Sequence, residues 1–194
     1  SLEEKTSASV FAALEHPIPL VPNIKLSMTD YADETSLVFS QTKSFNGVNY
    51  AAGSAVNTKV DLNFTDFTLY YEVLDNWLSL DLGLTVRQLD GEVTLASSNE
   101  TSTIDIDGAY PMGYVKAEIE LPLTGFFVGG EAYALSFEDK GRTTDISLYA
   151  GYEAEAGLGI TAGYRQINFN FDDLNNLNSD IDITGPYLSL YFHL

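Results

Sequence analysis

The chain has 194 residues, no cysteine, and 28 acidic side chains against 9 lysines and arginines, which gives a formal net charge of −19. This length allows a single domain over residues 1–194, and the lack of cysteine excludes a disulfide framework or a thiolate metal site. The negative charge repels phosphates and disfavours nucleic acid as a partner. No run of about 18 apolar residues predicts a transmembrane helix, and no signal-peptide pattern is present.

The first part of the chain alternates with a period of two, which is typical of strands. A strand is predicted over about 6–16 and is followed by the proline-rich turn 17–22. The next strand places Ile24, Leu26 and Met28 on one face. Residues 32–59 are rich in Ser, Thr, Asn and Gly, so we expect a long loop or strands that project from the sheet.

The clearest pattern lies between Tyr70 and Arg87. Its even positions from 78 to 86 are all large and aliphatic, and the odd positions hold small, polar or charged residues. A helix, with its period of 3.6, cannot place these side chains on one face. The sequence therefore predicts a hairpin with one apolar face, turning at 74–77.

Further hairpins are expected towards the C-terminus. The sequence predicts short turns at 122–125 and 155–157, the second with Gly157 in the left-handed region. It predicts longer polar loops at 90–109, 138–143 and 170–182, and a terminal strand that ends at Leu194. One rim of the sheet would then carry short turns and the other long loops.

No charged residue falls on the apolar face of any predicted strand. In a soluble barrel the apolar face would form the core, whereas in a membrane barrel it would face lipid and the charged face would line the interior. We favour the membrane barrel, because glycines are frequent on the charged face and aromatic residues gather where the apolar face meets the short turns. The predicted aromatic girdle is Tyr71, Trp77, Phe126, Tyr152 and Phe192.

The predicted fold is thus an all-β, antiparallel, up-and-down transmembrane barrel. About nine strands are found, and both the first and the last would end at the rim of short turns. Because bacterial single-chain barrels have an even number of strands, we expect ten strands, with one before Ser1.

Two resemblances support this prediction. The C-terminal segment 187–194 resembles the terminal strand that the barrel-assembly machinery of the outer membrane recognises. Most of the chain is similar to a family of small outer-membrane proteins that co-occurs with the GlyGly C-terminal sorting system, notably in 12–24, 69–77 and 116–122. This resemblance implies the outer membrane of a Gram-negative bacterium, with lipid and the assembly machinery as partners, and it brings no established activity.

No catalytic site, metal site or cofactor is predicted. His16 and His193 lie at the rim of short turns, away from the surface where a lipid-modifying enzyme would meet its substrate. The acidic segment 172–182 offers oxygen ligands for calcium but lacks the glycine and terminal glutamate of an EF-hand loop, so we favour a solvated loop.

The candidate site is a set of charged side chains that point inward. Its members are Glu15, Lys25, Glu72, Asp81, Arg87, Lys116, Glu118, Glu131, Glu153 and Arg165. The turn at 122–125 places Lys116 opposite Glu131, and the turn at 17–22 brings Glu15 near Lys25, so pairs of opposite charge are expected.

Three functions follow for a monomeric barrel. Cross-paired charges would give a largely occluded lumen and a structural or surface-interaction role, which we favour. The alternatives are a narrow, porin-like channel that favours small cations and, less favoured, a lipid-modifying enzyme.

Overall fold

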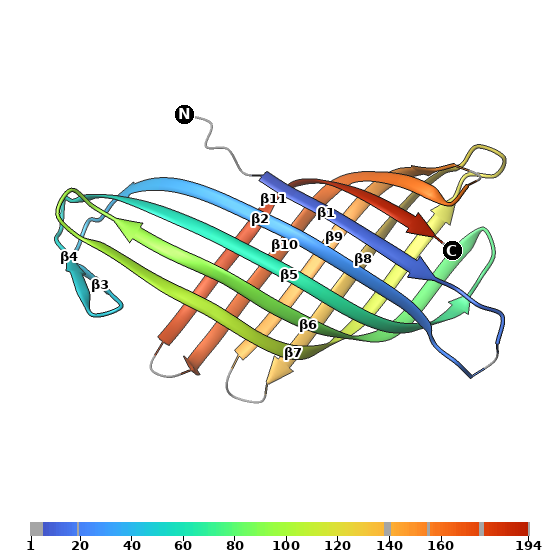
Figure 1. Cartoon of the computed structure of the whole chain (residues 1–194), viewed down its shortest axis with the longest axis horizontal. Helices are drawn as coiled ribbons and strands as arrows, with labels where there is room; N and C mark the ends of the chain where they lie inside the picture. The colour runs from blue at the N-terminus through green and yellow to red at the C-terminus, as the bar shows by residue number, and fades with distance from the viewer. Residues whose placement is uncertain (1–5, 19, 138–140, 155, 175–176, 194) are drawn as a thin grey trace.

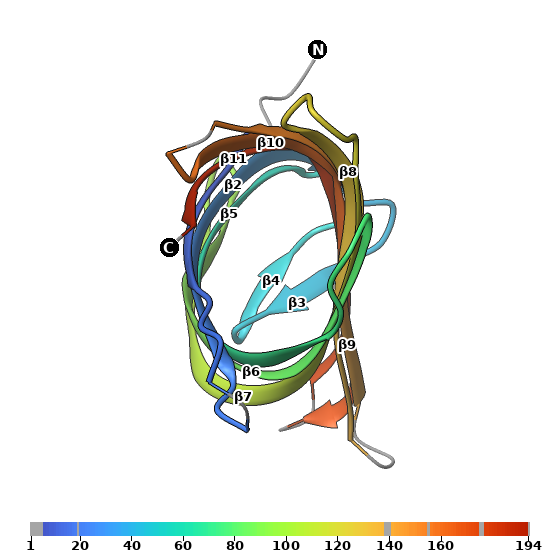
Figure 2. The ribbon, with the colours of Figure 1, turned by 90° about the vertical axis from the view of Figure 1, so that its right-hand side faces the viewer.

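A closed barrel of nine strands forms the body of the protein (Figures 1 and 2). This computed structural model describes residues 6–18, 20–137, 141–154, 156–174 and 177–193, and side chains within 8–18, 20–136, 141–154, 156–168 and 182–192. The strands are β1 (Thr6–Leu14), β2 (Asn23–Val38), β3 (Lys43–Phe45), β4 (Val48–Tyr50), β5 (Ala55–Leu74), β6 (Leu78–Ala96), β7 (Thr101–Glu120), β8 (Phe126–Phe137), β9 (Gly141–Glu153), β10 (Leu158–Leu174) and β11 (Leu177–His193). Strands β3 and β4 form a separate hairpin. The part of the chain that is described contains no helix long and apolar enough to cross a membrane.

The predicted all-β antiparallel barrel is confirmed, but the expected tenth strand is wrong. Strand β1 pairs with β2 along one edge and with β11 along the other, with Ala8 opposite Leu188 and Ala13 opposite His193. The pairing with β11 is parallel, whereas every other pair in the barrel is antiparallel. In an up-and-down barrel with an odd number of strands, the first and last strands run the same way, so only a parallel pair can close it.

The four short turns lie at one end of the barrel, as predicted, at the right of Figure 1. They join β1 to β2, β5 to β6, β7 to β8 and β9 to β10. Two of them use glycine in the left-handed region, Gly125 with φ 73° and Gly157 with φ 78°. Glycine adopts this conformation without the steric cost that a Cβ atom would bring.

The opposite end differs from the prediction. Residues 90–109 are not a loop, because β6 and β7 stay paired as far as Ala96 and Thr101. Residues 170–182 are likewise mostly strand, since β10 and β11 pair as far as Leu174 and Leu177. Between β2 and β5 the projecting strands do occur, and the β3–β4 hairpin caps them. This end was misjudged because its strands alternate without a continuous apolar face.

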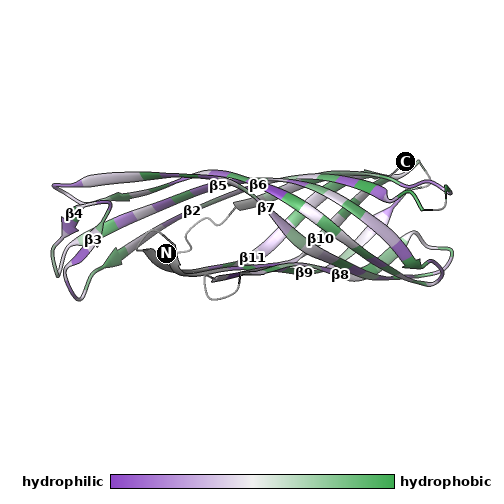
Figure 3. Cartoon of the chain, turned by 90° about the horizontal axis from the view of Figure 1, so that it is seen from below, coloured by the Kyte–Doolittle hydropathy of each residue, from purple (hydrophilic) through white to green (hydrophobic). Residues whose placement is uncertain are grey.

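The polarity of the barrel is inverted relative to a soluble one. Large apolar side chains on the outward face are exposed, among them Leu84 at 70% and Leu148 at 68%, whereas inward Arg87 and Thr85 are fully buried. Figure 3 shows the alternation of apolar and polar residues along the strands. This distribution, with apolar residues outside and charged residues inside, is the one expected of a membrane barrel.

The apolar outer face ends along a line that crosses neighbouring strands. On β2 the outward residues change from Met28 to Asp30, and on β6 they change from Val86 to Gln88. The register places Met28 and Gln88 opposite the same residue of β5, Thr65, and the next outward residue of β5 is Phe67. The outward faces of these strands thus form one apolar belt near the short turns. Beyond the belt, at the projecting end, their outward faces are polar.

Candidate functional site

The predicted charged residues do lie inside the barrel. Nine of the ten line one cavity of ≈ 210 Å³, and the tenth, Arg87, is completely buried beyond it. Strand alternation alone accounts for this placement, since each residue shares a face with buried neighbours on its strand. The structure therefore brings the set together in space, and the role of these residues stays a prediction.

The deepest contacts centre on Arg87 of β6. Its Nε and Nη2 atoms donate to the two carboxylate oxygens of Asp66 on the neighbouring strand β5, both at 2.7 Å. Its Nη1 atom lies 2.7 Å from Asp145 Oδ2, on β9. The guanidinium also lies over the rings of Phe64 and Tyr133. A planar guanidinium suits such simultaneous contacts with carboxylates and rings.

Asp145 continues the contacts to a second arginine. Arg165 of β10 donates from Nε and Nη2 to Asp145 at 2.8 and 2.6 Å. Its Nη1 donates to Thr29 of β2 at 3.1 Å. Two carboxylates and two guanidinium groups thus link β5, β6, β9, β10 and β2. We call Asp66, Arg87, Asp145 and Arg165 the arginine–aspartate layer.

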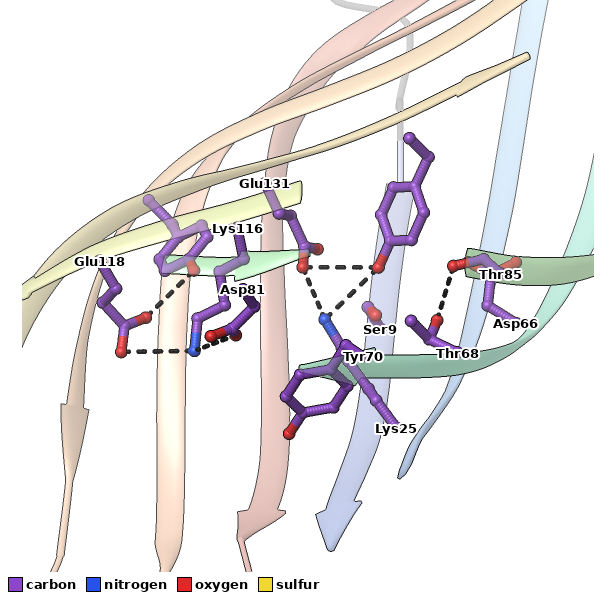
Figure 4. Close-up of polar contacts among 12 residues, drawn as sticks. Ser9, Lys25, Asp66, Thr68, Tyr70, Asp81, Thr85, Lys116, Glu118 and Glu131 are labelled. Carbon is purple, nitrogen blue, oxygen red and sulfur yellow. Dashed lines mark hydrogen bonds and ion pairs between the residues drawn. The ribbon is translucent and has the colours of Figure 1, made fainter. Parts of the chain in front are cut away.

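Nearer the short turns, Lys25 of β2 reaches across to β8. Its Nζ atom lies 2.6 Å from Glu131 Oε2 and within hydrogen-bond distance, 3.4 Å, of the Tyr133 hydroxyl (Figure 4). The same ammonium lies over the rings of Phe11 and Tyr114, 4.6 and 5.3 Å from their centroids. A long lysine stem from the opposite wall therefore binds Glu131.

The expected pairing of Lys116 is corrected by this contact. Lys116 does lie opposite Glu131 on paired strands, as predicted. Its ion pairs among the described residues are instead with Glu118 at 3.5 Å and Asp81 at 3.9 Å (Figure 4). The lateral position of a strand residue follows from turn length, but its partner depends on which side chains reach in from other walls.

Tyrosines bind several carboxylates at the mouth of the cavity. The hydroxyl groups of Tyr70, Tyr149 and Tyr191 donate to Glu15, Glu118 and Glu153 at 2.7, 3.0 and 2.8 Å, respectively. The charge-based prediction did not include these tyrosines, nor Asp66 and Asp145. All five share the polar face of their strands with predicted residues, which is the signal that could have found them.

An apolar layer lies beyond the arginine–aspartate layer, towards the projecting end. It consists of buried Tyr31, Leu62, Phe64, Leu89, Ile167 and Ile183. These residues come from β2, β5, β6, β10 and β11, so they meet from opposite walls. Together the two layers place buried side chains from opposite walls in the lumen beyond the cavity. The apolar layer is absent from the sequence-based prediction, although Val60, Leu62 and Phe64 alternate with Asp61 and Asn63 on β5 and so carry a signal for an apolar inner face there.

The projecting end has a small core of its own. Tyr50 of the β3–β4 hairpin packs with Val56 and Leu95, and its hydroxyl donates to the Leu95 carbonyl at 2.8 Å. Burial, with a smaller contribution from the Glu100 carboxylate, raises the pKa of Tyr50. The hairpin is thus packed against the tips of β5 and β6.

The five residues of the predicted aromatic girdle are all exposed on the outer face near the short turns. His16 lies in the first short turn. Its Nδ1 atom accepts a hydrogen bond from the backbone N–H of Ile18, and its backbone N–H donates to Oδ1 of Asn23. The side chain of His193 and those of 172–181 lie outside the described residues. Among the described residues no three His, Asp or Glu side chains gather closely enough to hold a metal ion.

These features define a class: a closed nine-stranded β-barrel with an apolar exterior and buried salt bridges inside. Comparison with protein-family models, curated proteins and solved structures found no match to this chain.

Proposed function

We propose that this protein is a bacterial outer-membrane barrel with a closed lumen, and that it acts as a structural or surface-interaction protein rather than as a channel or an enzyme. The observation that carries the proposal is the stack of two filled layers. Arg87 is 0% exposed, and Phe64 beside it is 1% exposed. Water and solutes therefore have no wide path past this level.

The location in a membrane is supported by the size of the apolar belt. On β6 the belt runs from Leu78 to Val86. At about 3.3 Å per residue this is roughly 30 Å along the strand. A strand tilt of about 40° reduces the height to roughly 23 Å, close to the band of about 25 Å in outer-membrane barrels. The similarity to the GlyGly-associated outer-membrane family agrees with this location.

The general architecture of outer-membrane barrels also supports an orientation in the membrane. Outer-membrane barrels carry short turns on the periplasmic side and longer segments outside the cell. The projecting strands and the β3–β4 hairpin would then be displayed at the cell surface, and the cavity would open to the periplasm. Lipid and, through β11, the assembly machinery are the expected partners of a monomer.

A narrow, cation-favouring channel is the second candidate. Its support is the acidic cavity, which would attract cations to one mouth. In this alternative the two layers would have to open during conduction.

Cysteine labelling tests the membrane location and orientation, since the natural chain has no cysteine. Ser98→Cys lies in the β6–β7 turn, and Thr124→Cys lies in the β7–β8 turn. In intact cells a membrane-impermeant maleimide should label Ser98→Cys and not Thr124→Cys. After outer-membrane permeabilisation both variants should react. Labelling of Thr124→Cys alone in intact cells would reverse the orientation, and recovery of the protein in the soluble fraction would refute the membrane location.

A further inference from the structure

The cavity below the arginine–aspartate layer carries more negative charge than its own cations neutralise. Nine carboxylates and three cationic side chains line it. Three of the carboxylates form close ion pairs, Glu131 with Lys25, Asp66 with Arg87 and Glu118 with Lys116. Two more, Glu15 and Glu153, accept hydrogen bonds from tyrosine hydroxyls. Those that remain gather towards the short turns, where the cavity is open through residues such as Glu72 and Asp75.

Two buried residues that line this cavity each have a polar atom with no hydrogen-bond partner among the described residues. Asp81 is 2% exposed and Ser189 is 3% exposed. The atoms are Asp81 Oδ1 and Ser189 Oγ. The only ion pair of Asp81 among the described residues is the long one to Lys116, at 3.9 Å, through the other oxygen. Because buried polar groups are normally satisfied, these atoms point to an occupant that donates to a carboxylate and a hydroxyl.

The walls of the cavity already bind one alkyl ammonium. The Lys25 side chain places its ammonium between the Glu131 carboxylate and the rings of Phe11 and Tyr114. Further rings line the same space, including Phe127, Tyr149 and Tyr191. Carboxylates combined with aromatic faces are the usual surroundings of organic ammonium groups.

The shape and the ligand set favour an organic cation over a metal ion. No group of three described His, Asp or Glu side chains could hold a metal. The cavity is also elongated, since Asp66 and Glu72 both line it and lie six positions apart on β5, roughly 20 Å at about 3.3 Å per residue. A linear molecule with several separated ammonium groups fits this distribution of carboxylates.

We infer that this cavity is a binding site for a linear aliphatic polyamine, held by Asp81 and Ser189 within the acidic, aromatic-lined space. Ammonium groups would donate to Asp81 Oδ1 and Ser189 Oγ, and the methylene segments would pack on the rings. Only the side of entry, the periplasm, rests on the proposed membrane orientation. Binding itself does not depend on that orientation or on the absence of conductance.

The test is calorimetric titration of spermidine into the purified, detergent-solubilised protein at low ionic strength. Saturable binding is expected. Asp81→Asn should weaken it about tenfold, the effect of losing one charge-assisted hydrogen bond, and Ser189→Ala about threefold, the effect of a neutral one. Asp105→Asn, which removes an exposed carboxylate of β7 outside the cavity, should leave the affinity unchanged.

Competition with magnesium at matched ionic strength distinguishes a specific polyamine site from nonspecific electrostatic attraction to an acidic protein. Magnesium should displace spermidine poorly. Absence of saturable binding, equal competition by magnesium, or equal loss of affinity in Asp105→Asn would each overturn the inference. If Asp81→Asn does not fold, the Ser189→Ala variant provides the test, because the Ser189 hydroxyl makes no hydrogen bond with the described residues and its removal breaks no such contact.

Discussion

At the scale of single residues, Asp145 is the buried carboxylate that pairs with two arginines at once. It is 1% exposed and binds both Arg87 and Arg165, which are themselves paired to groups on other strands. A buried ion pair contributes little net stability, because desolvation of the charges offsets their attraction. Removal of one partner is costly, since it leaves the other charge buried and uncompensated.

Asp145→Asn should therefore destabilise the barrel strongly. The amide keeps the shape of the side chain but leaves Arg165 without its carboxylate partner and Arg87 with Asp66 alone, so a loss of about 3–5 kcal/mol in the free energy of unfolding is expected. Urea unfolding of the protein folded into lipid vesicles measures this loss.

Asp61→Asn is the matched control. Asp61 also pairs with a cation, Lys59, at 2.6 Å, but both side chains are exposed at the projecting end. Exposed pairs contribute at most about 1 kcal/mol. Equal effects of the two substitutions would mean that water reaches the arginine–aspartate layer.

Glycine at position 159 is required by a neighbouring ring. The ring of Tyr191 lies across Gly159, where a Cβ atom would overlap it, and the Tyr191 hydroxyl is held by Glu153. Gly159→Ala should therefore lower the stability by about 1–3 kcal/mol, the usual cost of overpacking. Tyr191→Phe combined with Gly159→Ala should recover part of the loss, because the freed ring can move; a loss unchanged in the double variant would argue against the clash. The thermal unfolding midpoint reports both.

At the scale of elements, the closure of the barrel by β1 and β11 is its least expected feature. Val10 and Leu190 are paired in the parallel register, and both side chains point outward. Adjacent strands are about 4.8 Å apart, so an intervening tenth strand would separate these residues by roughly 10 Å.

Oxidation of a Val10→Cys, Leu190→Cys double variant tests this closure. A disulfide should form in the folded protein and close a large loop, which shifts its mobility on a non-reducing gel. Val10→Cys with Leu84→Cys, an outward residue of β6, should give no bond. Failure of the 10–190 pair to crosslink under conditions that oxidise exposed thiols would favour a missing strand.

Much of the fold could be predicted from the sequence within the apolar belt. There the outward residues of β6 are apolar and the inward ones polar, so strand type, facing and the four short turns were all evident. Beyond the belt the outward face becomes polar, as at Lys59, Asp61 and Asn63 of β5, while inward residues such as Leu62 and Phe64 are apolar. The polarity of the two faces is thus reversed there, and a prediction that requires one continuous apolar outer face interprets 90–109 as a loop.

The candidate site was less predictable than the fold. Strand alternation places Arg87 and Lys25 inside. Lys25 binds Glu131 on β8, however, and Arg87 binds Asp145 on β9 in addition to Asp66 on the adjacent strand β5. Which side chains meet across a lumen depends on the curvature of the barrel and on side-chain length, and local spacing reports neither. Only the lateral register, such as Lys116 opposite Glu131, followed from a turn.

At the scale of the whole molecule, the barrel combines an apolar belt with an interior divided into levels. A polar cavity lies towards the short turns, followed by the arginine–aspartate layer and then the apolar layer. The contacts across the lumen join strands from opposite walls and so constrain the relative positions of those walls.

Conductance in planar lipid bilayers tests this closed interior most directly. The proposed closure of the lumen at the level of Arg87 and Phe64, both buried, predicts that the reconstituted natural protein shows little or no steady current in symmetrical salt. Large, stable, cation-selective currents from the unmodified protein would contradict the account and would make the acidic cavity the entrance of a conduction path.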